Sequence, residues 1–505
     1  MIVTCEEMRR IEERAFANGV SAQTLMEEAG RLMARAVQQF FFLPGICHVF
    51  YGKGHNGGDA LVAARHLANA GWRVELHELF PQEALAPLTR EKLHELVASL
   101  QTRHFSEFDP LRSTPTIVLD GLLGIGAKGR LNEPIRGTAA EINRLRRDTG
   151  ATVFALDLPT GLDADTAAAD PDAVMADFTL CVGFAKRGLL ADTALDFVGR
   201  LAVLPLEAFT AQAEDPEETV TTPRSIAKLL PLRHYATHKG QCGRVGIVAG
   251  SRGFTGAAVM AANAAVRAGA GLVSLFVTPD IYSIVAASAM PEVMVTPLDC
   301  YLAVLDRPLD VLAIGPGLGR VDGPDELAVM EYFKGPMIVD ADGLTLLAEN
   351  PETLRRALGP RLLTPHPGEM LRLFPEAKNL SRRETSERFL ESVSGSQSPV
   401  TLLLKGSRTL VTQSFTNGFR TAFNTTGHPG MASGGMGDVL TGTCAALAGQ
   451  GLSLFDAARV GAWICGRAAE LSLADGAQSQ ESLAATDLFK QFGQAFRDLR
   501  DPQAC

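Results

Sequence analysis

The residues best suited to carry chemistry lie in one glycine-rich stretch, Asn424-Thr-Thr-Gly427-His-Pro-Gly430-Met-Ala-Ser-Gly434-Gly435-Met-Gly437-Asp438. Small and apolar residues at helical spacing follow it, so the glycines are predicted to open a helix. Backbone N–H groups at such a start can bind an anion, and the helix dipole adds to the attraction. Asp438 is then well placed to take a proton from a hydroxyl that attacks a bound phosphate. The alternative, a glycine-rich turn with a carboxylate at a helix start, stays open.

A second glycine-rich loop, Gly52-Lys-Gly54-His55-Asn56-Gly57-Gly58-Asp59, follows an apolar segment expected to be a strand. Two other polar turns also follow expected strands, Asp120 to Arg130 and Asp157 to Asp163. Carboxyl ends of parallel strands meet at one edge of a sheet, where ligands bind. The three turns therefore predict one site, in which the glycine loop brings N–H groups to a pyrophosphate. Tight turns without a ligand are the alternative for each.

Elements of two kinds must position these residues. Short apolar strands alternate with longer helical patterns on both sides of an acidic, proline-bearing break at about Leu206 to Ser225, and this alternation implies parallel sheets covered by helices. The expected strands are Ile46–Tyr51, Val74–Leu79, Thr116–Asp120, Thr152–Asp157, Phe178–Val182, Leu201–Leu204, Arg244–Ala249, Leu272–Thr278, Val311–Gly315, Met337–Asp340, Leu362–Thr364 and Val400–Lys405. The expected helices include Ala22–Phe40, Gly58–Ala70, Gly137–Arg147, Thr255–Ala268 and one starting near Gly437. We therefore expect two domains, 1–208 and 225–505, joined by an exposed linker at 209–224.

Composition excludes several classes of protein. The chain of 505 residues is 46% hydrophobic and 21% charged, as in soluble globular proteins. A net charge of −10 argues against a nucleic-acid-binding surface. Eight scattered cysteines suggest neither a zinc site nor a disulfide framework, and no signal peptide or membrane span is apparent. We expect a cytoplasmic protein that acts on small molecules, without nucleic-acid or membrane partners, as a homo-oligomer.

The motifs resemble those of known enzymes over nearly the whole chain. The stretch ending at Asp438 resembles the anion hole and catalytic aspartate of the ribokinase-like superfamily. Together with His366-Pro-Gly-Glu369, Lys405-Gly-Ser-Arg-Thr409 and Gly315-Pro-Gly317-Leu-Gly319, it resembles the ADP/ATP-dependent NAD(P)H-hydrate dehydratase branch. The three N-terminal turns are similar to those of NAD(P)H-hydrate epimerase. This order of halves matches the bifunctional NAD(P)H-hydrate repair family, and implies a Rossmann-like doubly wound sheet followed by a ribokinase-like α/β/α sandwich.

For the C-terminal half, the resemblance implies dehydration of the S hydrate of NADH or NADPH with ADP and Mg²⁺, giving AMP and phosphate. Asp438 is implied as the catalytic base, and phosphorylation turns the poor leaving group hydroxide into phosphate. The implied hydrated-cofactor contacts are Ala258, Gly319, His366 and Asp438. The implied nucleotide contacts are Lys405, Gly406, Ser407, Arg408, Thr409 and Gly437. Asp340 and Asp342, at the end of another expected strand, either reach the Mg²⁺ or cap the next helix.

For the N-terminal half, the resemblance implies epimerisation of the R and S hydrates at nicotinamide C6, with Asp157 as the acid/base residue. Asn56, Asp120 and Thr160 are implied ligands of K⁺, whose preference is for hard oxygen donors. The implied hydrated-cofactor contacts are His55, Asn56, Gly57, Gly58, Asp59, Gly124, Ile125, Gly126, Ala127, Lys128, Gly129, Arg130 and Asp157.

The match has departures, and two other interpretations stay open. The family usually shows two asparagines and a final glycine where this chain has His55, Asn56 and Ala60, and Thr160 stands where serine is common. These departures keep open a catalytically silent nucleotide-binding N-terminal half. A ribokinase-like small-molecule kinase is the other alternative, because it would share the anion hole and Asp438. The sequence leaves open the preference between ADP and ATP.

Overall fold

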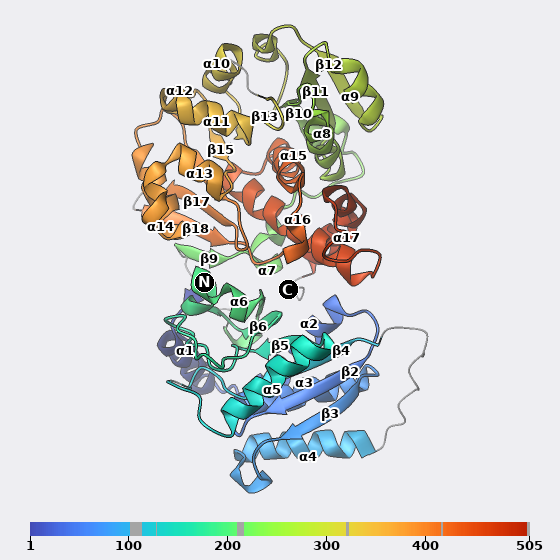
Figure 1. The fold of residues 1–505 in the computed structure, drawn as a ribbon, viewed down its shortest axis with the longest axis vertical. Helices are drawn as coiled ribbons and strands as arrows, with labels where there is room; N and C mark the ends of the chain where they lie inside the picture. Colours follow the sequence, from blue (N-terminus) through green and yellow to red (C-terminus); the bar gives the residue numbers. More distant parts are fainter. Residues whose placement is uncertain (102–113, 128, 210–216, 320–322, 416–417, 502–505) are drawn as a thin grey trace. The chain divides into compact units, whose positions relative to one another are not determined.

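The computed structural model describes residues 1–101, 114–127, 129–209, 217–319, 323–415 and 418–501. Two compact units adjoin in the sequence between Pro216 and Glu217. Each unit has its own, mainly parallel sheet with helices on both faces (Figure 1). The fold class predicted from the sequence, two α/β domains, is confirmed. The boundaries at 208 and 225 stay predictions.

The first unit is built on six parallel strands in the order β3-β2-β4-β5-β6-β8. The strands are β2 (Ile46–Tyr51), β3 (Arg73–Glu78), β4 (Thr116–Gly121), β5 (Thr152–Leu156), β6 (Phe178–Val182) and β8 (Arg200–Leu204). From β2 the chain moves outward to β3 and then returns to the other side of β2 with β4. Because the order reverses there, the carboxyl ends of β2 and β4 border the position where doubly wound sheets bind ligands.

Side chains that alternate along these strands fill two apolar layers. One layer includes Val49, Leu119 and Phe154 and packs with helices α1 (Cys5–Ala17), α2 (Ala22–Phe40), α3 (His55–Asn69) and α4 (Pro87–Gln101). The other includes Phe50, Val118 and Val153 and packs with α5 (Ile135–Thr149). A separate two-stranded sheet pairs β1 (Ile2–Val3) with β7 (Ala185–Lys186).

The second unit is built on ten strands in the order β12-β11-β10-β13-β14-β15-β16-β17-β18-β9, in which β17 alone is antiparallel to both of its neighbours. The strands are β9 (Glu218–Val220), β10 (Arg244–Val248), β11 (Leu272–Val277), β12 (Val293–Pro297), β13 (Val311–Ile314), β14 (Met337–Val339), β15 (Arg361–Leu363), β16 (Val400–Leu404), β17 (Leu410–Phe415) and β18 (Gly418–Phe423). The strand order reverses between β10 and β13, so the carboxyl ends from β13 to β16 form one continuous edge.

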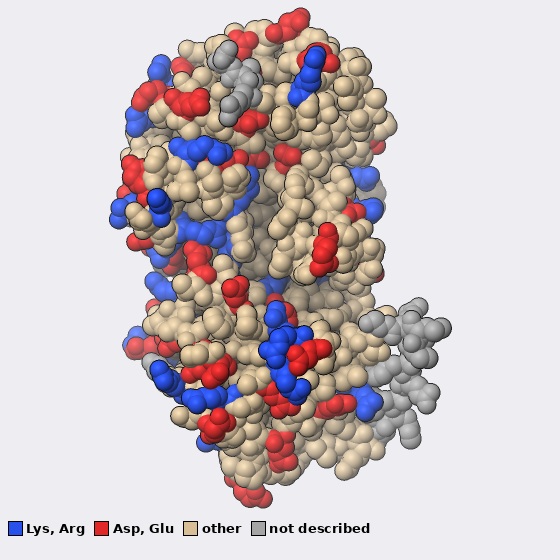
Figure 2. Space-filling model, viewed as in Figure 1, with Lys and Arg blue, Asp and Glu red and all other residues tan. Residues whose placement is uncertain are grey.

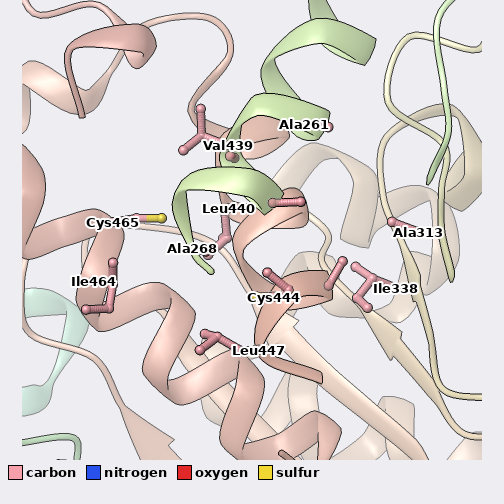
Figure 3. Close-up of a cluster of buried hydrophobic side chains, with 14 of the residues drawn as sticks. Ala261, Ala268, Ala313, Ile338, Val439, Leu440, Cys444, Leu447, Ile464 and Cys465 are labelled. Atoms are coloured by element: carbon pink, nitrogen blue, oxygen red, sulfur yellow. The ribbon is translucent and has the colours of Figure 1, made fainter. Parts of the chain in front are cut away.

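Two groups of helices cover this sheet (Figure 1). The core on one face includes α8 (Thr255–Arg267), α9 (Tyr282–Ser288), α15 (Met436–Gly449), α16 (Leu454–Ala474) and α17 (Leu488–Arg500). On the other side lie α10 (Pro324–Tyr332), α11 (Asp342–Glu349), α12 (Pro351–Arg356), α13 (Pro367–Leu373) and α14 (Arg382–Ser392). Figure 3 shows part of the first core, where α8, α15 and α16 meet strands β13 and β14.

Helix α15 lies unusually close to α8, because both helices are rich in small residues. A Cβ built on Gly442 would come within 1.9 Å of the Ala261 carbonyl oxygen, so only glycine fits there. This contact fixes the start of α15, and with it Asp438, relative to the sheet.

Part of the segment predicted as an exposed linker is a strand. Glu218–Val220 forms β9, which pairs parallel with β18, and Val220 is 5% exposed. The Thr221 N–H also donates to the Phe423 carbonyl at 2.8 Å. The expectation of an exposed segment was wrong for these residues. Valine and threonine favour the pleated, half-buried surface of a sheet, and this preference outweighs the acidic character of the preceding residues.

Acidic and basic side chains are interspersed over the face shown in Figure 2. The electrostatic potential at each binding site is therefore determined by the charged side chains of that site. Among the described helices, none is both long and apolar enough to cross a membrane.

Candidate active sites at two sheet edges

The first site lies where the strand order of the first unit reverses. Gly52 and Gly57 make a tight turn from β2 into α3, because a Cβ on Gly57 would come within 2.0 Å of the Gly52 carbonyl oxygen. His55 is exposed in the first turn of α3, whereas Asn56, Gly57 and Gly58 are buried. The loop therefore presents the N-terminal N–H groups of α3 at the sheet edge, as the sequence predicted.

Asn56, Asp120 and Thr160 converge beneath this loop. The buried Asp120 carboxylate accepts hydrogen bonds from the Thr160 N–H at 2.8 Å and the Thr160 hydroxyl at 2.7 Å. The Asn56 amide donates to the Leu123 carbonyl at 2.7 Å, and the Leu123 N–H donates to the Thr160 hydroxyl oxygen at 3.3 Å. The Asn56 Oδ1 atom is buried and has no hydrogen-bond partner among the described residues.

The charge in this cluster is also uncompensated within the described residues, where Asp120 has no ion pair. Burial raises the pKa of Asp120 to about 6, although the hydrogen bonds from Thr160 and Leu122 oppose the shift. A buried carboxylate beside an amide oxygen without a partner is a donor set that suits a hard monovalent cation.

Asp157 follows β5 in the uncommon left-handed backbone region, with φ 65°. Its Oδ1 atom accepts from Lys186 Nζ at 2.5 Å and from the Val182 N–H at 3.1 Å. Lys186 is 1% exposed, and no sequence motif singled it out. The available signal was a lysine shortly after the apolar strand that ends at Val182, but its partner lies 29 positions away.

The remaining residues predicted for this site lie around the same edge. Burial, followed by the charges of Asp157 and Glu12, raises the pKa of Asp59 well above its usual value. Ala60 is fully buried against Gly121. A Cβ built on Gly121 would come within 2.5 Å of the Ala60 Cβ. Gly124, Ile125, Gly126, Ala127, Gly129 and Arg130 form a loop that becomes exposed from Gly126 onward, and Lys128 lies outside the described residues.

The second site lies along the carboxyl ends of β13 to β16. The Asp340 carboxylate, 1% exposed at the end of β14, accepts from Lys405 Nζ at 2.8 Å and from the Thr441 hydroxyl at 2.7 Å. Lys405 Nζ also lies 3.7 Å from Glu369 Oε2. Burial alone would lower the pKa of Lys405, but Asp340 and Glu369 raise it above its usual value, so the ammonium stays charged. Glu369 stood in the His366 motif without an assigned role, and Thr441 lies just beyond the glycine-rich stretch that ends at Asp438.

Asp438 stands in the first turn of α15, beside this ion pair. Gly435 begins the helix with φ 90°, and a Cβ on Gly437 would lie 3.2 Å from Lys405 Nζ. Burial and then the charge of Asp340 raise the pKa of Asp438 to about 6, against the opposing effect of Lys405. The structure thus brings together Asp438, Gly437 and Lys405, as the sequence predicted.

His366 caps helix α13. Its Nδ1 atom accepts from the N–H groups of Gly368 at 3.0 Å and Glu369 at 3.3 Å, and its side chain is 52% exposed. Two backbone donors on Nδ1 leave the ring proton on Nε2. His366 is therefore held through Nδ1, while its Nε2 atom lies 3.5 Å from Glu369 Oε1.

The loop from Lys405 to Thr409 is supported from α14. Arg382 donates to the carbonyls of Arg408 at 2.7 Å, Leu404 at 3.0 Å and Lys405 at 3.2 Å. Of the residues predicted to contact nucleotide, Gly406 and Ser407 are exposed and Arg408 is 2% exposed. Sequence reasoning did not find Arg382, because nothing local to α14 marks its contact with a loop 22 positions or more away.

Two predicted contacts, Gly319 and Ala258, lie at the β13 end of the same edge. The Gly319 N–H donates to Asp342 Oδ2 at 2.8 Å, and Ala341 between the two aspartates has φ 48°. Ala258 is fully buried near the start of α8. Gly317 packs against the same helix, where a Cβ built on it would lie 2.9 Å from the Ala257 Cβ. In the described part of the chain, no group of three or more His, Cys, Asp or Glu side chains could hold a metal ion.

Both halves of the chain match family models. Residues 22–188 match the model described as YjeF-related protein N-terminus, and residues 245–492 match the model described as NAD(P)H-hydrate dehydratase.

Known proteins are similar over the full length. The bifunctional NAD(P)H-hydrate repair enzyme Nnr of Moorella thermoacetica is 33% identical over 99% of this chain and 97% of its own length. The enzyme with the same name from Coxiella burnetii is 34% identical over 96% of each chain. Among solved structures, the ADP/ATP-dependent NAD(P)H-hydrate dehydratase of Bacillus subtilis, co-crystallized with ATP/Mg²⁺, is 25% identical, with a TM-score of 0.47 over 56% of this chain and 98% of that chain.

Proposed function

This chain belongs to the bifunctional NAD(P)H-hydrate repair enzyme family, and we propose on that premise how its two sheet edges divide the repair between them. Hydrated NADH and NADPH form as R and S epimers at nicotinamide C6. The first unit interconverts the epimers, and the second dehydrates the S epimer with ADP. The observation that carries this division is that each unit places an aspartate, Asp157 or Asp438, at the carboxyl-end edge of its own parallel sheet.

Inversion at C6 requires the C6–O bond to break and to re-form on the other face of the ring. The departing hydroxyl takes up a proton, and the incoming water loses one. Asp157 performs this proton transfer in our proposal, because its Oδ1 atom is held by Lys186 and Val182 and its side chain remains 15% exposed. The N–H groups at the start of α3 bind the pyrophosphate of the hydrated cofactor.

K⁺ is the proposed ion of the first site. Asn56 Oδ1, the Asp120 carboxylate and the Thr160 hydroxyl would hold it, and the buried Oδ1 atom without a partner supports the assignment. The ion, when bound, supplies positive charge beside the nucleotide loop. Thr160 preserves the hydroxyl of the more common serine, so that departure does not weaken the site.

In the second unit, phosphoryl transfer prepares the hydroxyl for departure. Asp438 accepts the C6 hydroxyl proton while the oxygen attacks the β-phosphorus of ADP, which forms the C6–O–P bond and releases AMP. Phosphate then leaves with the C6–O bonding pair, and loss of a C5 proton restores the C5=C6 double bond. The N–H groups of Gly435 to Gly437 and the Lys405 ammonium stabilise the transferred charge.

Mg²⁺ enters this site on the nucleotide in our proposal. Asp340 is already bonded to Lys405 and Thr441, and Asp342 holds the Gly319 N–H, so the described residues build no cage of their own for the ion. That arrangement fits Mg²⁺, which proteins usually bind through a nucleotide's phosphates and few carboxylates. When bound, the ion neutralises phosphate charge.

The test is recovery of reduced-nicotinamide absorbance from a mixture of both hydrated NADPH epimers incubated with the full chain, Mg²⁺, K⁺ and ADP. Recovery of the whole mixture faster than spontaneous epimerisation allows is the expected result. Recovery that stops at the share of one epimer would reduce the first unit to a binding module. Accumulation of a stable phosphorylated product would instead favour the small-molecule kinase.

A further inference from the structure

Lys186 occupies an unusual place beside the first site. It lies on β7, which pairs with β1 at the other end of the unit's sequence, and its side chain is 1% exposed. Its three N–H groups have three acceptors, which are Asp157 Oδ1 at 2.5 Å, the Val182 carbonyl at 3.1 Å and Cys181 Sγ at 3.4 Å. The ammonium is therefore fully satisfied, and its position is fixed from three directions.

These contacts divide the two oxygens of Asp157. Oδ1 accepts from Lys186 and from the Val182 N–H, whereas Oδ2 has neither a hydrogen-bond partner nor an ion-pair partner among the described residues. With the backbone at φ 65°, the carboxylate is held at one oxygen and presents the other. Strained backbone of this kind persists where the surroundings fix it, and it clusters at functional sites.

Lys186 is the charged group that contacts Asp157, and the other titratable groups around this carboxylate are two acids and two thiols. Asp59 on α3 and Glu12 on α1 both have pKa values raised by burial and by the charge of Asp157. Burial raises the pKa of the thiols of Cys5 and Cys181 to about 11, so both thiols stay neutral. Burial alone would lower the pKa of Lys186, but Asp157 raises it above its usual value, so the ammonium stays charged.

We propose that Lys186 is the positioning residue of the epimerase reaction: it binds Asp157 Oδ1 and keeps the carboxylate ionised, so that Oδ2 exchanges protons with the oxygen at nicotinamide C6. This inference rests on the epimerase function proposed for the first unit. Lys186 itself does not touch the reacting atoms. A purely structural lysine, which only joins β7 to the end of β5, would stabilise the fold without affecting the protonation of Asp157.

The experiment compares the full chain with Lys186→Met and Lys186→Arg, and it follows epimerisation of hydrated NADPH across pH. Lys186→Met should lower the epimerase rate at neutral pH by about 10²-fold, because the carboxylate loses both its anchor and its counter-charge. The acidic limb of the pH–rate profile should move up by about 1–3 pH units. Lys186→Arg keeps the charge, so its acidic limb should stay at the wild-type position.

Two controls separate positioning from stability. Lys92→Met removes another ammonium from the same unit, also 1% exposed and paired with two carboxylates, Glu27 at 2.9 Å and Glu95 at 2.8 Å. It should lower the unfolding temperature and leave the acidic limb in place. The ADP-dependent dehydration of the S epimer by the same chain serves as an internal measure of intact protein. If Lys186→Met does not fold, Lys186→Gln, which retains a hydrogen-bond donor without the charge, should show the same shift.

An active wild type whose acidic limb does not move in Lys186→Met or Lys186→Gln would overturn the inference. A wild type that interconverts the epimers no faster than the spontaneous rate would instead overturn the epimerase function on which the inference rests.

Discussion

At the scale of single residues, Asp438 is the group whose loss should separate chemistry from binding. Asp438→Asn should lower dehydratase turnover by about 10²–10⁴-fold, because the amide cannot accept the C6 hydroxyl proton. Nucleotide affinity should persist, since the N–H groups of α15 and Lys405 remain. Turnover of the S epimer and ADP binding by calorimetry give the two readings. Full activity in this variant would remove Asp438 from the mechanism.

The dehydratase should also lose activity in acid. Burial and then the charge of Asp340 raise the pKa of Asp438 to about 6, so the carboxylate is ionised above that pH and protonated below it. Since only the ionised form accepts a proton, kcat/KM for the S epimer should fall about tenfold per pH unit below about 6. A pH series with ADP and Mg²⁺ held constant measures the limb. A rate that stays level through this range would contradict the role of Asp438.

Asp120 should govern the response of the epimerase to K⁺. Asp120→Asn keeps the size of the side chain but removes the negative charge that the buried cluster offers to a cation. The variant should lose the rise in epimerase rate that K⁺ produces in the wild type. Asp177→Asn is the matched control, because Asp177 also accepts a backbone N–H, that of Val153 at 2.9 Å, but at the amino end of β5. Unchanged K⁺ dependence in Asp120→Asn would exclude this site.

Local motifs were enough to single out Asp438, Lys405, Asp157 and the start of α3 as candidate site residues, and their roles stay predictions. The sequence did not predict their partners. Lys186 meets Asp157 across 29 positions and Thr441 meets Asp340 across 101, and both partners are ordinary residues within their own segments. Such pairs are set by how strands and helices pack, which single-sequence patterns do not encode.

At the scale of elements, apolar runs predicted the central strands well. Ile46–Tyr51 and Phe178–Val182 coincide with β2 and β6, because strands buried on both faces read as continuous apolar runs. The sequence did not predict β12, β17, β18 or β9. These lie toward the two ends of the second sheet, and each mixes buried residues with half-buried or exposed ones, such as Met294 in β12 at 45% exposure. Their signal is weaker because only part of each strand faces the core.

The contact between α8 and α15 leads to a prediction at this scale. Gly442→Ala would place a Cβ 1.9 Å from the Ala261 carbonyl oxygen, so α8 and α15 must move apart. Overpacking of this kind typically costs about 1–3 kcal/mol, and it should displace the start of α15 and reduce dehydration. Epimerisation by the same chain should be unchanged.

The control for that substitution is Gly256→Ala on the facing helix α8, where a Cβ would meet nothing within 4 Å. It should leave stability equal or slightly higher, since alanine favours helix over glycine. Thermal unfolding and the two activities provide the measurements. Equal dehydratase rates in both variants would show that close packing at Gly442 does not position Asp438.

At the scale of the whole molecule, two separate cores imply two separable stabilities. Phe154 is fully buried in the first unit and stacks on Phe178, with ring centroids 4.7 Å apart. Phe154→Ala should destabilise that unit by about 3–5 kcal/mol. Epimerase activity should therefore be lost at a lower temperature, while dehydratase activity is lost at the wild-type temperature. A common shift of both inactivation temperatures would show that the units unfold together.

The order of the two halves and their fold class followed from the sequence because each half repeats strand and helix patterns with its own motifs. The exposed linker did not hold throughout, since β9 joins the second sheet before the predicted end of the linker at residue 224. A homo-oligomer and a cytoplasmic location remain predictions.

The pairing of β1 with β7 has a practical consequence for anyone who handles this protein. Ile2 pairs with Ala185 and Val3 with Lys186, so a segment fused before Met1 would be attached to the strand that pairs with the strand of Lys186. An affinity tag fused there is expected to disturb this strand pairing, and so to lower epimerase activity while dehydratase activity is unchanged. A preparation that repairs only one epimer should therefore be checked for a segment fused before Met1 before the loss is assigned to a catalytic residue.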